Sequence, residues 1–322
     1  MEKERINRRE FIKSTAALAG AVMVSSSSCK EENVENVNTK KTAIDQVELG
    51  KTGMKLSRLG IGTGTISGTV QRNLGTKAFN NLIKHAYDQG ITFIDNAESY
   101  QTRPMIADAI KGLPREKLFI QSKIETHGLQ NSIFSSGRTR TETSNNLEKI
   151  EGFLKEYKVD YIDSLLVHCQ ASPTWDDDNK RLLEDLTKAK EKGYIRSHGV
   201  SCHSLPATTK AASLDWVEVN LVRINPQGVN VDTASTDIFA QSRKSDVSRI
   251  VEQMKIMRQN GHGIIGMKLI GQGVFTDIKE RKKSLTWVIQ QDIVDAVIVG
   301  VKSKEEIDEA IKHINEAFAE KA

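Results

Sequence analysis

The chain has 322 residues, of which 38% are apolar and 27% charged, and its formal net charge is +4. This length is enough for one large domain with a sizeable core. Residues 1–29 hold five basic and three acidic residues, so the rest of the chain has 41 basic and 39 acidic residues and a net charge of +2. That balance gives no electrostatic case for nucleic-acid binding. No apolar run reaches the roughly 20 residues that a membrane-spanning helix needs.

Residues 1–29 have the layout of an export signal. A charged start that contains Arg8 and Arg9 is followed by the short apolar run Thr15–Val24 and by small residues that end at Cys29. The arginine pair resembles the twin-arginine signal, and Cys29 resembles the lipid-modified cysteine of bacterial lipoproteins. We therefore expect export by the bacterial Tat pathway to the periplasm, with a lipid anchor on Cys29 as the expected membrane contact. A chance amphipathic helix is the alternative.

Residues 30–43 are polar and lack an apolar period, which predicts a flexible tether before a domain at residues 44–322. In that domain, short apolar strand segments alternate with helical stretches, as a (β/α)8 barrel requires. The two longest loops are expected at Thr126–Thr141 and Asn225–Ser245, on the face where such barrels bind substrate. The eight expected strands are Ser57–Gly62, Ile91–Ile94, Leu118–Ser122, Tyr161–Val167, Ile195–Val200, Trp216–Leu221, Gly263–Lys268 and Ala296–Val299.

Three of these strands run directly into ionisable side chains: Asp95 and Tyr100 follow the second, Lys123 the third and His168 the fourth. Parallel strands place such residues together at the C-terminal mouth of a barrel, where they form a proton-transfer site. The set resembles the Asp, Tyr, Lys and His tetrad of the aldo/keto reductase family. The resemblance extends to segments that are similar to the family's opening hairpin, its fifth and seventh strands and its final strand and helix: Val47–Gly64, Gly193–Ser201, Gly263–Gly273 and Val294–Ile311.

The resemblance implies hydride transfer between a nicotinamide cofactor and a small carbonyl or alcohol substrate. Tyr100 would be the general acid and base, and we expect Lys123 to lower the pKa of its phenol. Asp95 would hold Lys123 by an ion pair. His168 would bind the substrate oxygen and stabilise charge that develops on it.

The same resemblance implies a set of cofactor contacts. The Gln that the family carries on its sixth strand has no visible counterpart in this sequence. Asn220 is proposed to make its contact with the cofactor, and Arg223 and Asn225 are the alternatives. Ser201 would hold the nicotinamide carboxamide, although Cys202 replaces the Asn that normally follows. The implied cofactor-binding residues are Thr63, Ser201, Asn220, Gly271, Gly273, Lys302 and Ser303.

Lys302 and Ser303 stand where the family binds the 2′-phosphate of NADP. The Arg and Asn expected after them are replaced by Glu306 and Ala310. NADP is therefore the expected cofactor, with NAD as the alternative.

Besides Cys29, the cysteines are Cys169 and Cys202, and no CxxC pair occurs, so neither a zinc site nor an iron–sulfur cluster is expected. The two cysteines end neighbouring strands, about 4.8 Å apart, so a disulfide between them is one hypothesis. Two half-buried free thiols are the favoured one. His85, His198, His262 and His313 lack a strand-end context and are interpreted as packing or surface residues.

Three functions remain open at this stage. The favoured one is an exported, NAD(P)H-dependent aldo/keto reductase-like enzyme. A second is a sugar or alcohol dehydrogenase with permanently bound cofactor, which suits a compartment that is poor in free cofactor. The third is a non-catalytic nicotinamide-binding redox sensor, which the intact set of four side chains argues against.

Overall fold

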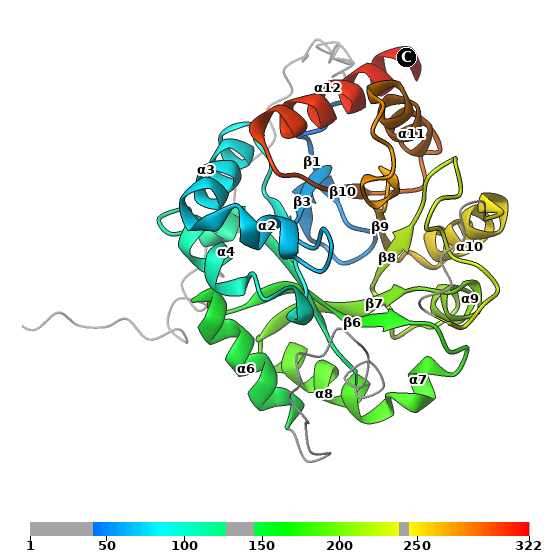
Figure 1. Cartoon of the computed structure of the whole chain (residues 1–322). Helices are drawn as coiled ribbons and strands as arrows, with labels where there is room; N and C mark the ends of the chain where they lie inside the picture. Colours follow the sequence, from blue (N-terminus) through cyan, green and yellow to red (C-terminus); the bar gives the residue numbers. More distant parts are fainter. Residues whose placement is uncertain (1–40, 127–144, 238–244, 322) are drawn as a thin grey trace, which may run out of the picture. The chain divides into compact units, whose positions relative to one another are not determined.

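A closed barrel of eight parallel strands forms the centre of the computed structural model, which describes residues 41–126, 145–237 and 245–321 (Figure 1). Neighbouring strands pair in chain order, and β10 pairs with β3 to close the barrel. The strands are β3 (Leu59–Gly62), β4 (Phe93–Asp95), β5 (Phe119–Ile124), β6 (Ile162–Gln170), β7 (Ile195–Cys202), β8 (Val219–Arg223), β9 (Gly263–Met267) and β10 (Ala296–Gly300). All eight expected strands are confirmed, with boundaries that move by a few residues.

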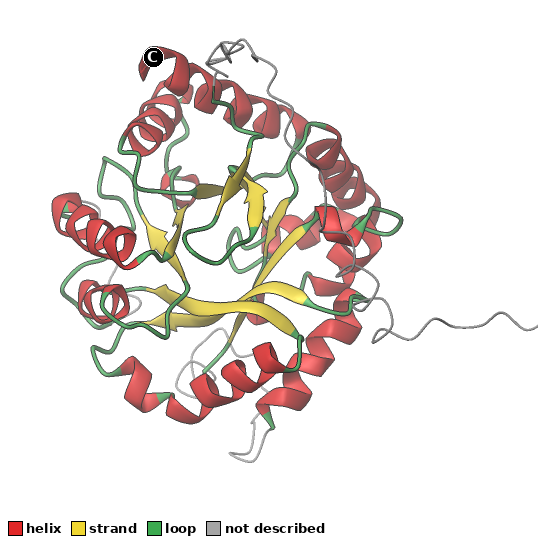
Figure 2. Cartoon of the chain, turned by 180° about the vertical axis from the view of Figure 1, so that it is seen from behind, coloured by secondary structure: helices red, strands yellow, loops and turns green. Residues whose placement is uncertain are grey.

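Helices surround the barrel and are seen from behind in Figure 2. The sequence of α3 shows why the helices pack around the barrel. Its buried residues Phe79, Leu82, Ile83 and Ala86 recur at the three- and four-residue spacing that places them on one face of the helix. Side-chain caps at Asn145, Ser204, Asp246 and Asp277 begin α6, α9, α10 and α11. The helices are α2 (Thr69–Asn73), α3 (Gly75–Asp88), α4 (Arg103–Ala109), α6 (Asn146–Tyr157), α7 (Trp175–Asp178), α8 (Lys180–Glu191), α9 (Leu205–Ala212), α10 (Val247–Asn260), α11 (Ile278–Gln290) and α12 (Lys304–Lys321). Three short 3₁₀ turns are η1 (Glu98–Tyr100), η2 (Arg115–Lys117) and η3 (Gly271–Gly273).

An antiparallel hairpin of β1 (Gln46–Glu48) and β2 (Lys55–Ser57) closes the N-terminal end of the barrel. Its turn is bound there because the backbone N–H of Lys51 donates to the carbonyl of Gly261 (2.8 Å), which lies two residues before the start of β9. Leu49 and Leu56 are fully buried and belong to the cluster of apolar side chains that fills the barrel. The opposite, C-terminal end is therefore the open one, as expected for a site built from strand ends.

The barrel interior is packed around Phe93 and Phe119, whose rings meet edge to face with centroids 5.3 Å apart. Gly60 makes room for them, since a Cβ there would lie 2.3 Å from the Phe93 ring. Along β4 and β5, side chains alternate between the interior and the helix layer. Asp95 lies two residues after Phe93, and Lys123 lies four residues after Phe119. The same alternation therefore directs both side chains inward at the mouth.

Among the described residues, no helix is both long enough and apolar enough to cross a membrane.

Candidate active site

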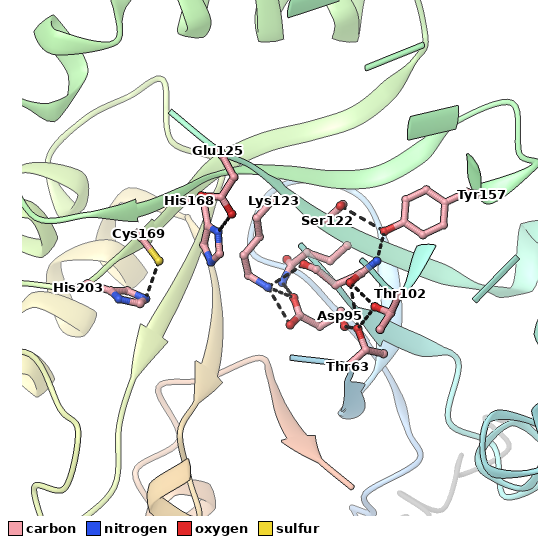
Figure 3. Close-up of polar contacts among 12 residues, drawn as sticks. Thr63, Asp95, Thr102, Ser122, Lys123, Glu125, Tyr157, His168, Cys169 and His203 are labelled. Atoms are coloured by element: carbon pink, nitrogen blue, oxygen red, sulfur yellow. Dashed lines mark hydrogen bonds and ion pairs between the residues drawn. The ribbon is translucent and has the colours of Figure 1, made fainter. Parts of the chain in front are cut away.

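A buried ion pair lies at the mouth of the barrel (Figure 3). Lys123 Nζ donates to both carboxylate oxygens of Asp95, at 2.7 and 2.8 Å, and to the carbonyl of Asn96 at 2.8 Å. Gln121 Nε2 also donates to Asp95 Oδ1 at 2.8 Å. The side chains of Lys123 and Asp95 are 1% and 3% exposed, so each charge depends on the other for its counter-charge.

Tyr100 lies beside this pair, at the end of the 3₁₀ turn η1. Lys123 Nζ is 5.2 Å from the centroid of its ring. The ring packs on Gly64, where a Cβ would lie 2.3 Å from ring atoms and 2.7 Å from the hydroxyl oxygen. Arg72 fixes the backbone, because its Nη1 donates to the carbonyls of both Tyr100 and Ser67.

The expected lowering of the Tyr100 pKa by Lys123 does not occur in this structure. Burial raises the pKa of the phenol well above its usual value, and charge interactions with the acidic groups Asp95, Cys169 and Glu125 raise it further. The physical reason is that Asp95 neutralises the Lys123 ammonium at close range, while the buried phenolate would lose its hydration. Tyr100 is therefore a neutral hydroxyl at physiological pH.

His168 faces Tyr100 with ring centroids 5.9 Å apart, and its Nδ1 lies 2.6 Å from Glu125 Oε1. Burial alone would lower the pKa of His168, but Cys169 and Glu125 raise it to about 10. Burial likewise opposes ionisation of Glu125, yet His168, Ser99 and Lys149 lower its pKa to about 2. The pair is therefore an imidazolium and a carboxylate near neutral pH.

A β-bulge aims His168 into the mouth. The pairing of β6 with β7 shifts register between Val167 and Gln170, and Cys169 has the left-handed φ of +54°. An extra residue in a strand re-aims the side chains beside it. The expected strand end at Val167 was therefore too early, since the strand continues past the bulge to Gln170.

Glu125 was not identified from the sequence. It stands two residues after Lys123, directly beyond the end of β5. The period of two along a strand places it on the same face as Lys123, which is the one signal that could have indicated it.

Thr63 lies in a buried polar network rather than on the cavity wall. Its Oγ1 donates to the carbonyl of Asp95 (2.9 Å) and lies 3.0 Å from Asn96 Oδ1. Asn96 in turn donates to the Tyr157 hydroxyl at 2.8 Å, and Thr102 donates to Asn96 at 2.8 Å. Figure 3 shows this network on the far side of Asp95 from His168. It fixes the turn that carries Asp95.

A cavity of about 420 Å³ opens from Asp95 and Tyr100 toward the start of α12. Gly273 and Lys302, two of the residues proposed to bind the cofactor, line it. Gly271 is buried beside it with a φ of +58°, a conformation that favours glycine. Ser303 lies next to Lys302 at the start of α12, where its Oγ accepts from the Glu306 N–H at 3.4 Å.

Ser201, which is expected to bind the nicotinamide carboxamide, points into the barrel interior. Its register partner Leu221 belongs to the barrel interior, so the Ser201 hydroxyl also points inward. The Ser201 Oγ is buried and has no hydrogen-bond partner among the described residues. A buried hydroxyl without a partner is costly, and the carboxamide of a bound nicotinamide would satisfy it. The cavity, the unpaired hydroxyl and the glycine turn fit a nicotinamide dinucleotide.

Asn220 is directed away from this cavity. It alternates with Val219 and Leu221 of the interior, so it faces the helix layer, where Nδ2 lies 3.0 Å from His262 Nδ1. Arg223 faces the mouth instead, where it is paired with Asp232 and donates to the His203 carbonyl at 2.6 Å.

Cys169 and Cys202 are free thiols, so the hypothesis of a disulfide is not supported by the structure. Cys169 Sγ lies 3.5 Å from His203 Nε2 (Figure 3), whereas Cys202 packs into the apolar layer between barrel and helices. Residues 169 and 202 thus point in different directions, as diverging Cβ vectors would predict.

Four other histidines have local contacts. His85 pairs with Asp308 at 2.7 Å, His198 stacks on Trp216 at 4.3 Å, and His313 is buried. His262 contacts Asn220, as described above. Within residues 41–126, 145–237 and 245–321, no group of three or more His, Cys, Asp or Glu side chains could hold a metal ion.

Comparison with known proteins identifies the family. The model of the aldo/keto reductase family matches residues 58–285, which is most of the chain. The chain belongs to the aldo/keto reductase family. Its fold is also that of aldo-keto reductase AKR11C1 from Bacillus halodurans, determined in a holo form, with a TM-score of 0.61 at 15% identity, covering 87% of this chain and 96% of that one.

Two bacterial relatives match about half of this aldo/keto reductase. Aldo-keto reductase YhdN of Bacillus subtilis (strain 168) is 30% identical over 50% of this chain and 48% of its own length. The NADH-specific methylglyoxal reductase of Escherichia coli (strain K12) is 29% identical over 48% of this chain and 51% of its own length. The matched stretch thus spans about half the length of these relatives. Residues 1–40, which include the expected export signal, lie outside the described residues.

Proposed function

We propose that the chain is a nicotinamide-dependent oxidoreductase that interconverts a small carbonyl compound and the corresponding alcohol, with Tyr100 as general acid and base. The observation that carries this proposal is the convergence of Tyr100, the Lys123–Asp95 pair and His168 beside a cavity that fits a nicotinamide dinucleotide. A bound nicotinamide would supply or accept the hydride.

Protonation of the substrate oxygen is the step that the chain itself performs. When hydride is added to a carbonyl carbon, the oxygen becomes an alkoxide, which is a stronger base than a phenolate. The raised pKa of Tyr100 keeps its proton in place until that alkoxide forms. The reverse reaction returns the proton to Tyr100.

His168 and Lys123 have supporting roles in this proposal. The His168 imidazolium, held by Glu125 through Nδ1, would direct its Nε2–H at the substrate oxygen and stabilise negative charge that develops there. Lys123 and Asp95 together present a fixed dipole beside the phenol. Because all of these groups are already held in place, little reorganisation is needed during the reaction.

The cavity wall near α12 bears on the choice between NADP and NAD. Glu306 accepts from the Lys302 backbone N–H at 2.8 Å, and its other oxygen lies 3.9 Å from Lys302 Nζ. Glu309 is held by Arg281 at 2.6 Å. These two carboxylates neutralise the two cations, so the 2′-phosphate of NADP would meet no surplus positive charge. We propose that the NADP preference expected from the sequence is weak and that NAD is accepted.

Turnover by the purified full chain tests the proposed function. Methylglyoxal, which the name of the Escherichia coli relative mentions, is a suitable first substrate, together with a panel of simple aldehydes and alcohols. Loss of NADH or NADPH absorbance with any aldehyde supports the proposal. Absence of turnover with all substrates in either direction contradicts it.

Export through Arg8 and Arg9 is a separate proposal, supported by the order of charged, apolar and small residues at the N-terminus. Changing both arginines to Lys keeps the charge but removes the guanidinium pair. Cell fractionation should then show the protein retained in the cytoplasm, and labelling with a radioactive fatty acid tests lipidation of Cys29. Unchanged export of the double variant contradicts the twin-arginine route.

A further inference from the structure

Lys268 brings a charge to the active-site mouth that the proposed reaction does not use. It directly follows β9, and it lines the cavity together with Asp95 and Tyr100. Its φ of +61° is left-handed, which is unfavourable for a residue with a Cβ. Its carbonyl accepts from Asn225 Nδ2 at 3.1 Å and from the Gly271 N–H at 2.9 Å, and these bonds hold that conformation.

The Lys268 ammonium has no hydrogen bond or ion pair within the described part of the chain. Other charged groups at the mouth each have a partner of opposite charge: Lys123 with Asp95, His168 with Glu125, and Arg223 with Asp232. Burial, and then the charges of Arg223 and Lys123, lower the pKa of Lys268 to about 8, so it is still mostly protonated at neutral pH. A largely buried cation without a partner is unfavourable, and an anionic ligand group would relieve it.

The end of β9 places Lys268 at the catalytic end of the cavity. Met267, which directly precedes Lys268, pairs in register with Arg223 of β8, whose side chain faces the mouth. The charges of Arg223, Lys123 and Asp95 act on Lys268. Lys302 and Glu306, at the end near α12, are not among them. A partner for Lys268 would therefore lie close to the reacting carbonyl rather than at the adenosine end of a cofactor.

We propose that the substrate carries a carboxylate and that Lys268 binds this group, so that the enzyme acts on oxo-acids or aldehyde-acids in preference to neutral carbonyl compounds. This inference rests on the proposed function. A single ammonium without a partner matches the single charge of a carboxylate, and a charge-assisted hydrogen bond in a partly buried site is strong. Binding the carboxylate would also fix the orientation of the carbonyl relative to Tyr100 and His168.

Two four-carbon aldehydes that differ at one end give a direct test. Succinic semialdehyde ends in a carboxylate where butanal ends in a methyl group. We expect wild-type kcat/KM for succinic semialdehyde to exceed that for butanal by about 10- to 150-fold, the factor expected for one hydrogen bond to a charged group. Lys268→Met should abolish most of this ratio and leave butanal turnover within a few-fold, whereas Lys268→Arg should retain a preference for the acid. Lys279→Met, which removes an exposed lysine of α11, is the matched control and should leave the ratio unchanged.

Equilibrium binding separates this inference from the proposed function, because it needs no turnover. Isothermal titration of succinate into the protein, alone and with oxidised cofactor, should show at least about tenfold weaker binding to Lys268→Met than to wild type. The dissociation constants of NAD and NADP should be the same for both proteins. Weaker binding of both cofactors by Lys268→Met, with equal losses for the two aldehydes, would mean that Lys268 pairs with the cofactor pyrophosphate and would overturn the inference. Equal use of both aldehydes by the wild type would overturn it as well.

Discussion

Replacing Glu125 by Gln is the change whose effect the structure defines most fully. Gln has the same shape and can still accept a hydrogen bond from His168 Nδ1, but it carries no charge. In the wild type, burial opposes the imidazolium while Cys169 and Glu125 favour it, which gives a pKa of about 10. Without the carboxylate, we expect the pKa of His168 to fall by at least about two units, which corresponds to ~2.7 kcal/mol of lost preference for the charged ring.

The Glu125→Gln variant should also be less stable than the wild type, and the difference in their free energies of unfolding should depend on pH. The lowered pKa of Glu125 gives stability above its ordinary value of 4.5, which is lost as pH falls through about 2. The raised pKa of His168 gives stability below its ordinary value of 6.5, which is lost as pH rises through about 10. The difference between wild type and variant should thus be largest between pH 4.5 and 6.5, at about 1–3 kcal/mol.

Two measurements decide this prediction. Titration of the His168 ring by NMR gives its pKa in each protein, and urea unfolding at several pH values gives the difference in free energy of unfolding. Glu151→Gln is the control, since Glu151 lies on α6, away from the mouth, and accepts a hydrogen bond from the Tyr194 hydroxyl. If His168 titrates at the same pH in wild type and Glu125→Gln, the assigned ion pair is wrong.

Three further predictions follow from the same geometry. Tyr100→Phe should lower kcat at least ~100-fold and leave the Kd of cofactor nearly unchanged, because it removes the proton donor and keeps the ring; turnover within a few-fold of wild type would refute the role of the phenol. Gly64→Ala should lower kcat at least ~10-fold without unfolding the protein, because the new Cβ would overlap the Tyr100 ring and displace it. Gly152→Ala on α6 is its control, because the added Cβ would meet nothing within 4 Å beyond its own helix backbone; equal activity of the two variants would contradict the packing argument. Glu306→Gln should lower the Kd of NADP relative to that of NAD by about 3- to 10-fold, since it removes a negative charge from the cavity wall; fluorescence titration with both cofactors checks this, and an unchanged ratio would place the 2′-phosphate elsewhere.

Much of the fold could be predicted because buried parallel strands are short apolar runs that end abruptly in polar residues. FID, FIQSK and IDSLLVH are such runs, and each ends close to a residue of the mouth. The positions of Asp95, Lys123 and His168 followed from that pattern, and the structure brings them together. The family match supports the same interpretation of the chain.

The contacts that depend on side-chain direction could not be predicted in the same way. A parallel strand is apolar on both faces, so VEVNLVR does not reveal that Asn220 faces the helices while Arg223 faces the mouth. The bulge that aims His168 at Glu125 depends on the pairing of β6 with β7, which local sequence does not show. The sign of the Tyr100 pKa shift was wrong because a nearby lysine was considered without its counter-ion, Asp95.

Transfer of isotopic label tests the central claim most directly. The full chain is incubated with an aldehyde and with NADH or NADPH that carries deuterium at the transferring position of the nicotinamide, and the product alcohol is examined by mass spectrometry. The proposed function predicts one deuterium on the carbinol carbon of the product made by wild type, and almost no product from Tyr100→Phe that still binds cofactor. Product without deuterium, or undiminished product from Tyr100→Phe, would contradict direct hydride transfer with Tyr100 as the proton donor.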